Sequence, residues 1–163
     1  MFRKIEMDVH GCWQSVQFSP DGIYALAGDQ VTQPKMWDLE TGELVKSFGG
    51  YSGQTMTAQI SGAGNVLMTG HGFSNSVSLW DYKNGSLLKI IKNDPECLSS
   101  TATISYDGAR AGFGGWNMKA GKSVISFSSV NGSGRMIRIH SDSSGTHSKA
   151  PVFFKDGKKM VWA

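Results

Sequence analysis

The stretch SPDGIYALAGDQVTQPKMWDLETGELVKSF, residues 19–48, decides the fold because its parts return at a fixed spacing. Trp37-Asp38 recurs as Trp80-Asp81, 43 residues further along the chain. The glycine four residues after each Asp, Gly42 or Gly85, keeps the same spacing. Repeats of about 20–50 residues are typical of folds assembled from stacked supersecondary units.

A five-residue pattern follows the same spacing. It consists of Met or Leu, a large apolar residue, Lys or Arg, any residue, and Ile or Phe, and it occurs at residues 1–5, 44–48 and 87–91, with successive starts 43 residues apart. A poorer copy at residues 136–140 starts 49 residues after the third. In this longer third unit we align Phe127-Ser128 with the two Trp-Asp pairs. The repeat therefore covers nearly the whole chain.

Each unit also contains a turn signal. Asp21-Gly22 has counterparts in Asp107-Gly108 and Asp156-Gly157, and Ala63-Gly64 stands at the corresponding place in the second unit. Asp-Gly between apolar runs indicates a tight hairpin. The runs between these turns have strand length and partly alternate between apolar and polar residues, which predicts four strands per unit. Because a four-stranded sheet cannot bury both faces alone, the units must stack face to face.

The composition is that of an ordinary globular chain. Its 163 residues are 39% hydrophobic and 18% charged, and 21 of them are glycine, which favours many turns and few helices. The net charge of +3 is spread along the sequence, so we expect no nucleic-acid partner. Cys12 and Cys97 form neither a disulfide framework nor a zinc motif. No apolar run suits a membrane span or a signal peptide, so we expect no membrane association and, by default, a cytoplasmic protein.

The sequence resembles the WD-repeat (Trp-Asp repeat) β-propeller family in its Asp-Gly turn, its Trp-Asp pairs and the strand that follows each pair. The resemblance implies an all-β fold of propeller blades, each with four antiparallel strands named a to d, in an incomplete ring of three full blades and part of a fourth. The single segment 1–163 then divides into an outer strand at 1–7, blade 1 at 8–50, blade 2 at 51–93, a degenerate blade 3 at 94–148 and a partial blade 4 at 149–163.

The sequence departs from the family in its polar residues. In this family a His, a Ser or Thr, an Asp and the Trp of each blade form a buried hydrogen-bonded set, but Ala27 falls at the Ser/Thr position of blade 1. In blade 2 Thr69 is available, while Phe73 or Ser74 stands where the Asp is usual. We therefore expect Trp37 and Trp80 to donate to backbone carbonyls, and the blades to be less stable than consensus blades.

The repeat does not close a ring. Dividing 163 residues by the 43-residue period gives about 3.8 units, whereas propellers have about 4 to 8 blades. If the outer strand at 1–7 completed the last blade, that blade would still lack strand c. The chain is then a fragment of a longer propeller, which we favour, or half of a two-chain ring, a homodimer formed by blade stacking.

No stretch of the sequence carries a recognisable catalytic or cofactor motif. Residues 114–123 end in Gly-Lys-Ser, but position 116 is Trp where the phosphate-binding loop needs Gly, and the following residues are strand-like. We expect a glycine-rich loop between strands b and c there. The four histidines have no metal-ligand spacing, so we expect no metal and no cofactor.

The resemblance therefore implies a non-catalytic scaffold that binds a protein or peptide, because in this family the b–c and d–a loops line the face that binds partners. One alternative is a propeller enzyme or a small-ligand-binding module with a site in the central channel. Strand a of each unit brings no ionisable group to that channel, which favours the scaffold. A further alternative is a truncated remnant without independent function. The candidate partner-binding residues, expected to be exposed, are Gln30, Gln33, Tyr51, His71, Phe73, Trp116 and Lys119.

Overall fold

The computed structural model describes residues 13–29, 33–49, 55–71, 76–92, 95–131, 137–140, 151–157 and 159–161. These residues form strands and turns, with no helix among them. The strands build three four-stranded antiparallel sheets and one two-stranded sheet. The predicted all-β fold, with blades of four antiparallel strands in an unclosed row, is confirmed. The outer strand expected at residues 1–7 lies outside the described residues.

Each sheet is formed by strands that follow one another in the chain. The first sheet contains β1 (Trp13–Phe18), β2 (Tyr24–Asp29), β3 (Lys35–Asp38) and β4 (Leu44–Ser47). The second contains β5 (Thr55–Ile60), β6 (Val66–His71), β7 (Ser76–Asp81) and β8 (Leu87–Lys92). The third contains β9 (Cys97–Ile104), β10 (Arg110–Asn117), β11 (Lys122–Ser129) and β12 (Ile137–His140), and the fourth β13 (Val152–Phe153) and β14 (Met160–Val161).

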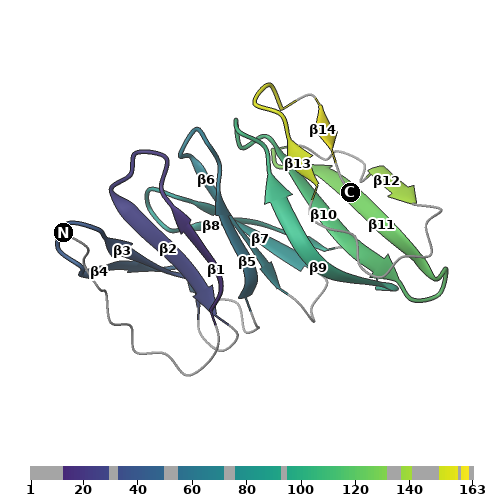
Figure 1. The fold of residues 1–163 in the computed structure, drawn as a ribbon, viewed down its shortest axis with the longest axis horizontal. Helices are drawn as coiled ribbons and strands as arrows, with labels where there is room; N and C mark the ends of the chain where they lie inside the picture. The colour runs from purple at the N-terminus through teal and green to yellow at the C-terminus, as the bar shows by residue number, and fades with distance from the viewer. Residues whose placement is uncertain are drawn as a thin grey trace.

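The four sheets lie side by side in chain order and do not close into a ring (Figure 1). The first strands of the sheets are neighbours, since β5 contacts both β1 and β9, and β13 contacts β9. The fourth strands lie at the opposite edge of each sheet. This is the radial order of a propeller, in which strand a is innermost and strand d outermost.

The hydrophobic core lies between the sheets. The cluster in the first seam, between the first and second sheets, includes Leu26, Met36, Phe48 and Trp80. The rings of Phe48 and Trp80 meet edge to face, with centroids 6.2 Å apart at 66°. A second cluster fills the seam between the second and third sheets and includes Phe113. Each sheet thus buries a face against its neighbour, as the stacking argument requires.

Side-chain oxygens also join the innermost strands across the seams. The Ile60 N–H donates to Gln17 Oε1 at 2.7 Å, and the Ile104 N–H donates to Gln59 Oε1 at 2.9 Å. The Ala58 N–H donates to Ser15 Oγ at 2.9 Å. These bonds satisfy backbone donors at the inner edge of the next sheet, where there is no further strand to pair with.

The repeated Asp residues hold the turns together. Asp38 Oδ1 accepts hydrogen bonds from the N–H groups of Glu40 and Thr41, both at 2.8 Å, and Asp81 does the same in the second sheet. Gly22, in the turn between β1 and β2, has a φ of 73°, a conformation that L side chains rarely adopt. The Asp and Gly positions of the repeat therefore encode turn geometry.

The predicted alignment of the third unit is wrong by one residue. Val66 and Arg110 are counterparts, because each lies two residues after the turn glycine of its sheet, Gly64 or Gly108. Val66 pairs with Asp81, and Arg110 pairs with Ser129. Ser129 therefore takes the Asp position and Ser128 the Trp position. Phe113, which is fully buried, occupies the place corresponding to Thr69 and supplies the bulk that Ser128 lacks.

Candidate functional site

The second sheet contains a buried polar set. The Trp80 Nε1–H donates to Thr69 Oγ1 at 2.9 Å, the Thr69 hydroxyl lies 3.4 Å from His71 Nε2, and that nitrogen lies 3.1 Å from Ser78 Oγ. All four side chains are buried. The expectation that Trp80 donates to a backbone carbonyl is therefore wrong, because Thr69 faces it from the neighbouring strand.

His71 is not an exposed residue as predicted. It is the last residue of β6, pairs with Thr55 and Ser76 in the flanking strands, and is 4% exposed. The strand extends one residue beyond the point where the sequence placed a loop, so the imidazole lies inside the polar set. Gln30, Tyr51 and Phe73 lie outside the described residues and stay predictions.

We define the loop face as the end of the sheets that carries the b–c and d–a connections. Gln33 lies on this face, in the b–c connection of the first sheet. This exposed side chain lies against the d–a connection after β4, where a Cβ built on Gly49 would come 2.2 Å from Gln33 Oε1. The Phe48 N–H donates to the Pro34 carbonyl at 2.8 Å in the same place. The b–c and d–a connections of the first sheet are thus in contact.

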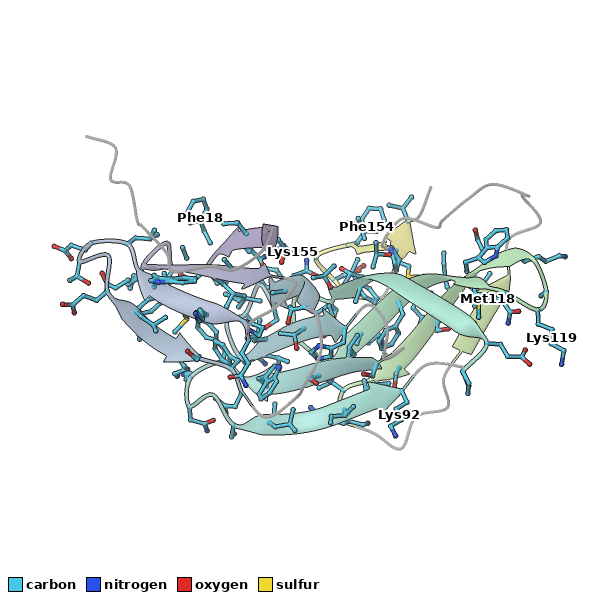
Figure 2. The ribbon with its side chains drawn as sticks, turned by 90° about the horizontal axis from the view of Figure 1, so that it is seen from below. Phe18, Lys92, Met118, Lys119, Phe154 and Lys155 are labelled. Carbon is cyan, nitrogen blue, oxygen red and sulfur yellow. The ribbon has the colours of Figure 1, made fainter. Side chains whose placement is uncertain are left out.

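A charged pair joins the b–c turn of the third sheet to the d–a connection that precedes this sheet. Lys119 Nζ lies 3.3 Å from Glu96 Oε1, and the Met118 N–H donates to the Glu96 carbonyl at 2.9 Å. Figure 2 shows Met118 and Lys119 projecting at the end of the molecule formed by this sheet. The turn is held by the Ala120 N–H, which donates to Asn117 Oδ1 at 2.7 Å.

Trp116 belongs to a strand and not to a loop. Residues 110–117 form β10, and only 118–121 form the b–c turn, so the expected glycine-rich loop is mostly strand. Gly114 and Gly115 pair with β11 on one side and β9 on the other. Trp116 is half-buried two residues before the exposed Met118.

The opposite end of the sheets, which we call the turn face, carries the a–b and c–d turns and contains a pocket of about 480 Å³ in the first seam. Tyr24, Met36, Lys46, Tyr82 and Lys83 are among its lining residues. Nearby, the Ser19 hydroxyl and the Ile23 N–H hydrogen-bond to Asp21 and hold the pKa of that carboxyl below its usual value. Asp107 has the corresponding partners, Ser105 and Ala109, and its pKa is lowered in the same way.

Two further observations bear on the kind of site. Within the part of the chain that the structure describes, no group of three or more His, Cys, Asp or Glu side chains is placed to hold a metal ion. In the same residues there is no helix of the length and apolarity needed to cross a membrane.

No protein-family model matches the chain. It is 27% identical over 152 residues to Pre-mRNA-processing factor 19 homolog 2 of Arabidopsis thaliana and 24% identical over 150 residues to Pre-mRNA-processing factor 19 of Oryza sativa subsp. japonica. Both alignments cover 91% of this chain and 27% of the relative, so the chain spans about a quarter of their length. Among solved structures, the β-propeller domain of Cps50 (Swd1) from Myceliophteria thermophila matches with a TM-score of 0.73 at 16% identity, over 94% of this chain and 49% of that one.

The propeller match agrees with the Trp-Asp repeat and with the four-stranded sheets. The chain folds into β-propeller blades, and its repeat resembles that of the WD-repeat family. We call the sheets blades 1 to 4 in chain order, and the polar set of Thr69, His71, Ser78 and Trp80 lies in blade 2.

The residues that line the pocket were not among the predicted site residues. They come from separate turns of blades 1 and 2 that meet only when the blades stack. One signal was available, because Lys46 is the basic residue of the repeated five-residue pattern. Its Nζ donates to the Lys83 carbonyl of the next blade, and Lys89 reaches the carbonyls of Ser129 and Val130 in the same way.

Proposed function

We propose that this propeller segment is a non-catalytic scaffold that binds a protein or peptide partner through its loop face. The observation that carries the proposal is the b–c turn of blade 3, where Met118 is 59% exposed beside the Lys119–Glu96 ion pair, and Trp116, two residues earlier, is half-buried. A flexible thioether adapts to partner surfaces, and binding energy concentrates in aromatic side chains with polar groups around them.

The alternative of an enzyme or small-ligand module has less support. In a propeller the channel is lined by strand a, and the sequences of β1, β5, β9 and β13 contain no Asp, Glu, His, Lys or Arg. Acid–base chemistry requires such groups within hydrogen-bond reach of a substrate. A channel site would therefore need residues from elsewhere in the chain.

Site-specific photo-crosslinking tests the scaffold proposal. A benzophenone amino acid replaces Met118 in one variant and Lys92, an exposed residue of outer strand β8, in a control. We expect position 118 to give a discrete cross-linked product with one partner, and position 92 to give none. An excess of protein without the benzophenone amino acid should abolish the product from position 118. Equal, non-competable labelling from both positions would contradict the proposal and favour a remnant without independent function.

We also propose that the ring is completed by further blades, either those of a longer protein or those of a second copy. Val16 and Phe18 on β1 are each 64% exposed. Their counterparts on β5, Ala58 and Ile60, are packed against blade 1 and are only 7% and 3% exposed. Apolar side chains at these positions thus pack on a preceding blade wherever the structure describes one. Figure 2 shows Phe18 and Phe154, from the first and last blades, projecting on the same side.

Light scattering coupled to size-exclusion chromatography separates the two ways of completing the ring. A sharp species at twice the 17.6 kDa chain mass would support a two-chain ring. A monomer, or a heterogeneous aggregate formed through the exposed apolar faces, would support the longer propeller that we favour.

The compartment is also a proposal. The sequence gives the cytoplasm as the default, and the two plant relatives are named as pre-mRNA-processing factors, which adds the nucleus as a second candidate. Imaging a fluorescent fusion beside a nuclear stain distinguishes the two.

A further inference from the structure

The pocket in the first seam of the turn face has an apolar floor. Met36 is buried in the core cluster between blades 1 and 2, and Tyr24 packs partly buried against the same cluster. Val45 on outer strand β4 lines the pocket and is half-exposed. A large apolar side chain that entered here would extend the existing core and lose its contact with water.

Tyr82 supplies a buried polar group in this pocket. The residue is 8% exposed, and its hydroxyl makes no hydrogen bond to the residues that the structure describes. The oxygen itself is covered by the protein, so Tyr82 lines the pocket through its other atoms. Burial is the largest cause of the raised pKa of Tyr82. The phenol therefore remains a neutral donor at physiological pH.

The rim of the pocket is positively charged. Lys46 Nζ donates to the Lys83 main-chain carbonyl, which fixes its ammonium group at the seam, and the Lys83 side chain is exposed beside it. Asp21 is the acidic residue among the lining side chains, and its carboxylate accepts hydrogen bonds from Ser19 and Ile23. Two ammonium groups against one carboxylate leave an excess positive charge that a carboxylate ligand would neutralise.

The next seam lacks these features. Val130 is the counterpart of Tyr82 in the third sheet. The Tyr82 N–H donates to the carbonyl of Asn65, the residue before β6, and the Val130 N–H donates to the carbonyl of Ala109, the residue before β10. Val130 is buried in the core cluster of that seam. Lys89 repeats the bond of Lys46, so the bond itself belongs to blade stacking. The buried phenol and the exposed Lys83 distinguish the first seam.

We propose that this pocket binds a short peptide segment of a partner protein that carries a large apolar side chain next to an acidic residue. The apolar side chain lies on Met36 and Val45 beside Tyr82, and the carboxylate pairs with Lys46 and Lys83. The inference rests on the proposed scaffold function and adds a second contact on the face opposite Met118. A partner that used both contacts would bind more tightly than either contact alone allows.

Titration of the full chain with defined peptides tests this inference by two-dimensional NMR at low salt. The probe is acetyl-Glu-Leu-Glu-amide, and the control probes are acetyl-Lys-Leu-Lys-amide and acetyl-Glu-Gly-Glu-amide. We expect the first probe to shift the amide signals of Lys46, Gly64 and Lys83 and to bind about tenfold more tightly than either control. No shift of these signals at millimolar probe, or equal affinity for the lysine probe, would overturn the inference.

Three variants assign the effect to the pocket. Lys83→Glu should weaken binding of the acidic probe about tenfold, while Tyr82→Phe, which removes a covered hydroxyl, should leave both the binding and the dispersed spectrum of the folded chain unchanged. Lys92→Glu, an equal charge change at an exposed position on outer strand β8, should leave binding unchanged. An equal loss in Lys92→Glu would overturn the inference by showing attraction to net charge alone.

The result is separable from that of the scaffold proposal. If the peptides fail to bind while the cross-link from position 118 persists, the pocket is refuted and the loop-face proposal stands. If the peptides bind and position 118 gives no cross-link, the loop-face proposal is refuted and the pocket stands.

Discussion

Trp80 donates its indole N–H to the hydroxyl of Thr69 at 2.9 Å, with both side chains buried on adjacent strands of blade 2. The same hydroxyl lies 3.4 Å from His71 Nε2. In blade 1 the place of Thr69 is taken by Ala27, and in blade 3 by Phe113. Blade 2 is therefore the described blade in which this tryptophan and this hydroxyl form a polar pair.

Replacing Thr69 with Val should destabilise the protein by about 1–3 kcal/mol, because the change keeps the shape and leaves the buried indole N–H without its acceptor. The free energy of unfolding in urea measures the effect. Thr57→Val is the matched control, since the Thr57 hydroxyl is buried and makes no hydrogen bond to the described residues. We expect that change to be neutral or slightly stabilising. Equal losses in both variants would contradict the role of the Trp80 bond.

Removing either repeat tryptophan should be costly. Trp37 and Trp80 are 5% and 1% exposed, so Trp37→Ala and Trp80→Ala should each lower the free energy of unfolding by about 3–5 kcal/mol. Urea denaturation followed by circular dichroism checks this. A loss near zero at Trp37 would mean that the repeat register of blade 1 is wrong.

The glutamine bonds between innermost strands should stabilise the seams. Gln17→Met keeps most of the side-chain length and removes the acceptor of the Ile60 N–H, so we expect a loss of about 1–2 kcal/mol. Gln59→Met should have a similar effect through Ile104. Hydrogen exchange of the two amides locates the change. Faster exchange throughout the chain, without preference for Ile60 or Ile104, would argue against a seam-specific role.

The turn aspartates should make stability depend on pH in the acid range. Hydrogen bonds lower the folded-state pKa of Asp21 and Asp107, so their contribution is complete above the ordinary aspartate pKa of about 3.9 and is lost as the pH falls through the folded-state values. In the double variant Asp21→Asn/Asp107→Asn, the melting temperature should lie below that of the parent at neutral pH. The gap should close in acid.

Ser19→Ala provides the control for this pH effect. It removes the largest cause of the lowered pKa of Asp21, so the pH-dependent loss of stability should be smaller than in the parent chain and should be complete at a higher pH. A gap between the double variant and the parent that stayed constant from neutral pH into acid would show that the effect is not carried by these carboxyl groups.

The local repeat made the fold predictable. Asp38 and Asp21-Gly22 encode two kinds of turn through bonds to residues two or three positions away, and Trp37 marks a buried strand position that recurs at the same spacing. The predicted alignment of the third unit is wrong because Ser128 lacks an aromatic marker and Phe113, on the adjacent strand β10, supplies the missing volume. Spacing alone does not reveal such an exchange between strands.

The candidate site was less predictable for a related reason. Burial of His71 depends on one extra residue of pairing at the end of β6, and the ion pair of Lys119 depends on the d–a connection that brings Glu96 to it. Neither relationship is visible in a local pattern, because each joins residues that are distant in the sequence.

The sequence by itself determined the four-strand unit, its turns and the need for the units to stack, because strand pairing and turn chemistry follow from residues close together in the chain. Only the tertiary structure decided that Trp80 pairs with Thr69, that Gln17 and Lys46 join blade 1 to blade 2, and that Tyr82 and Lys83 share a pocket. These contacts exist because stacking places residues from neighbouring repeats within hydrogen-bond distance. The 43-residue period of the sequence gives the order of the units but not the way their faces fit together.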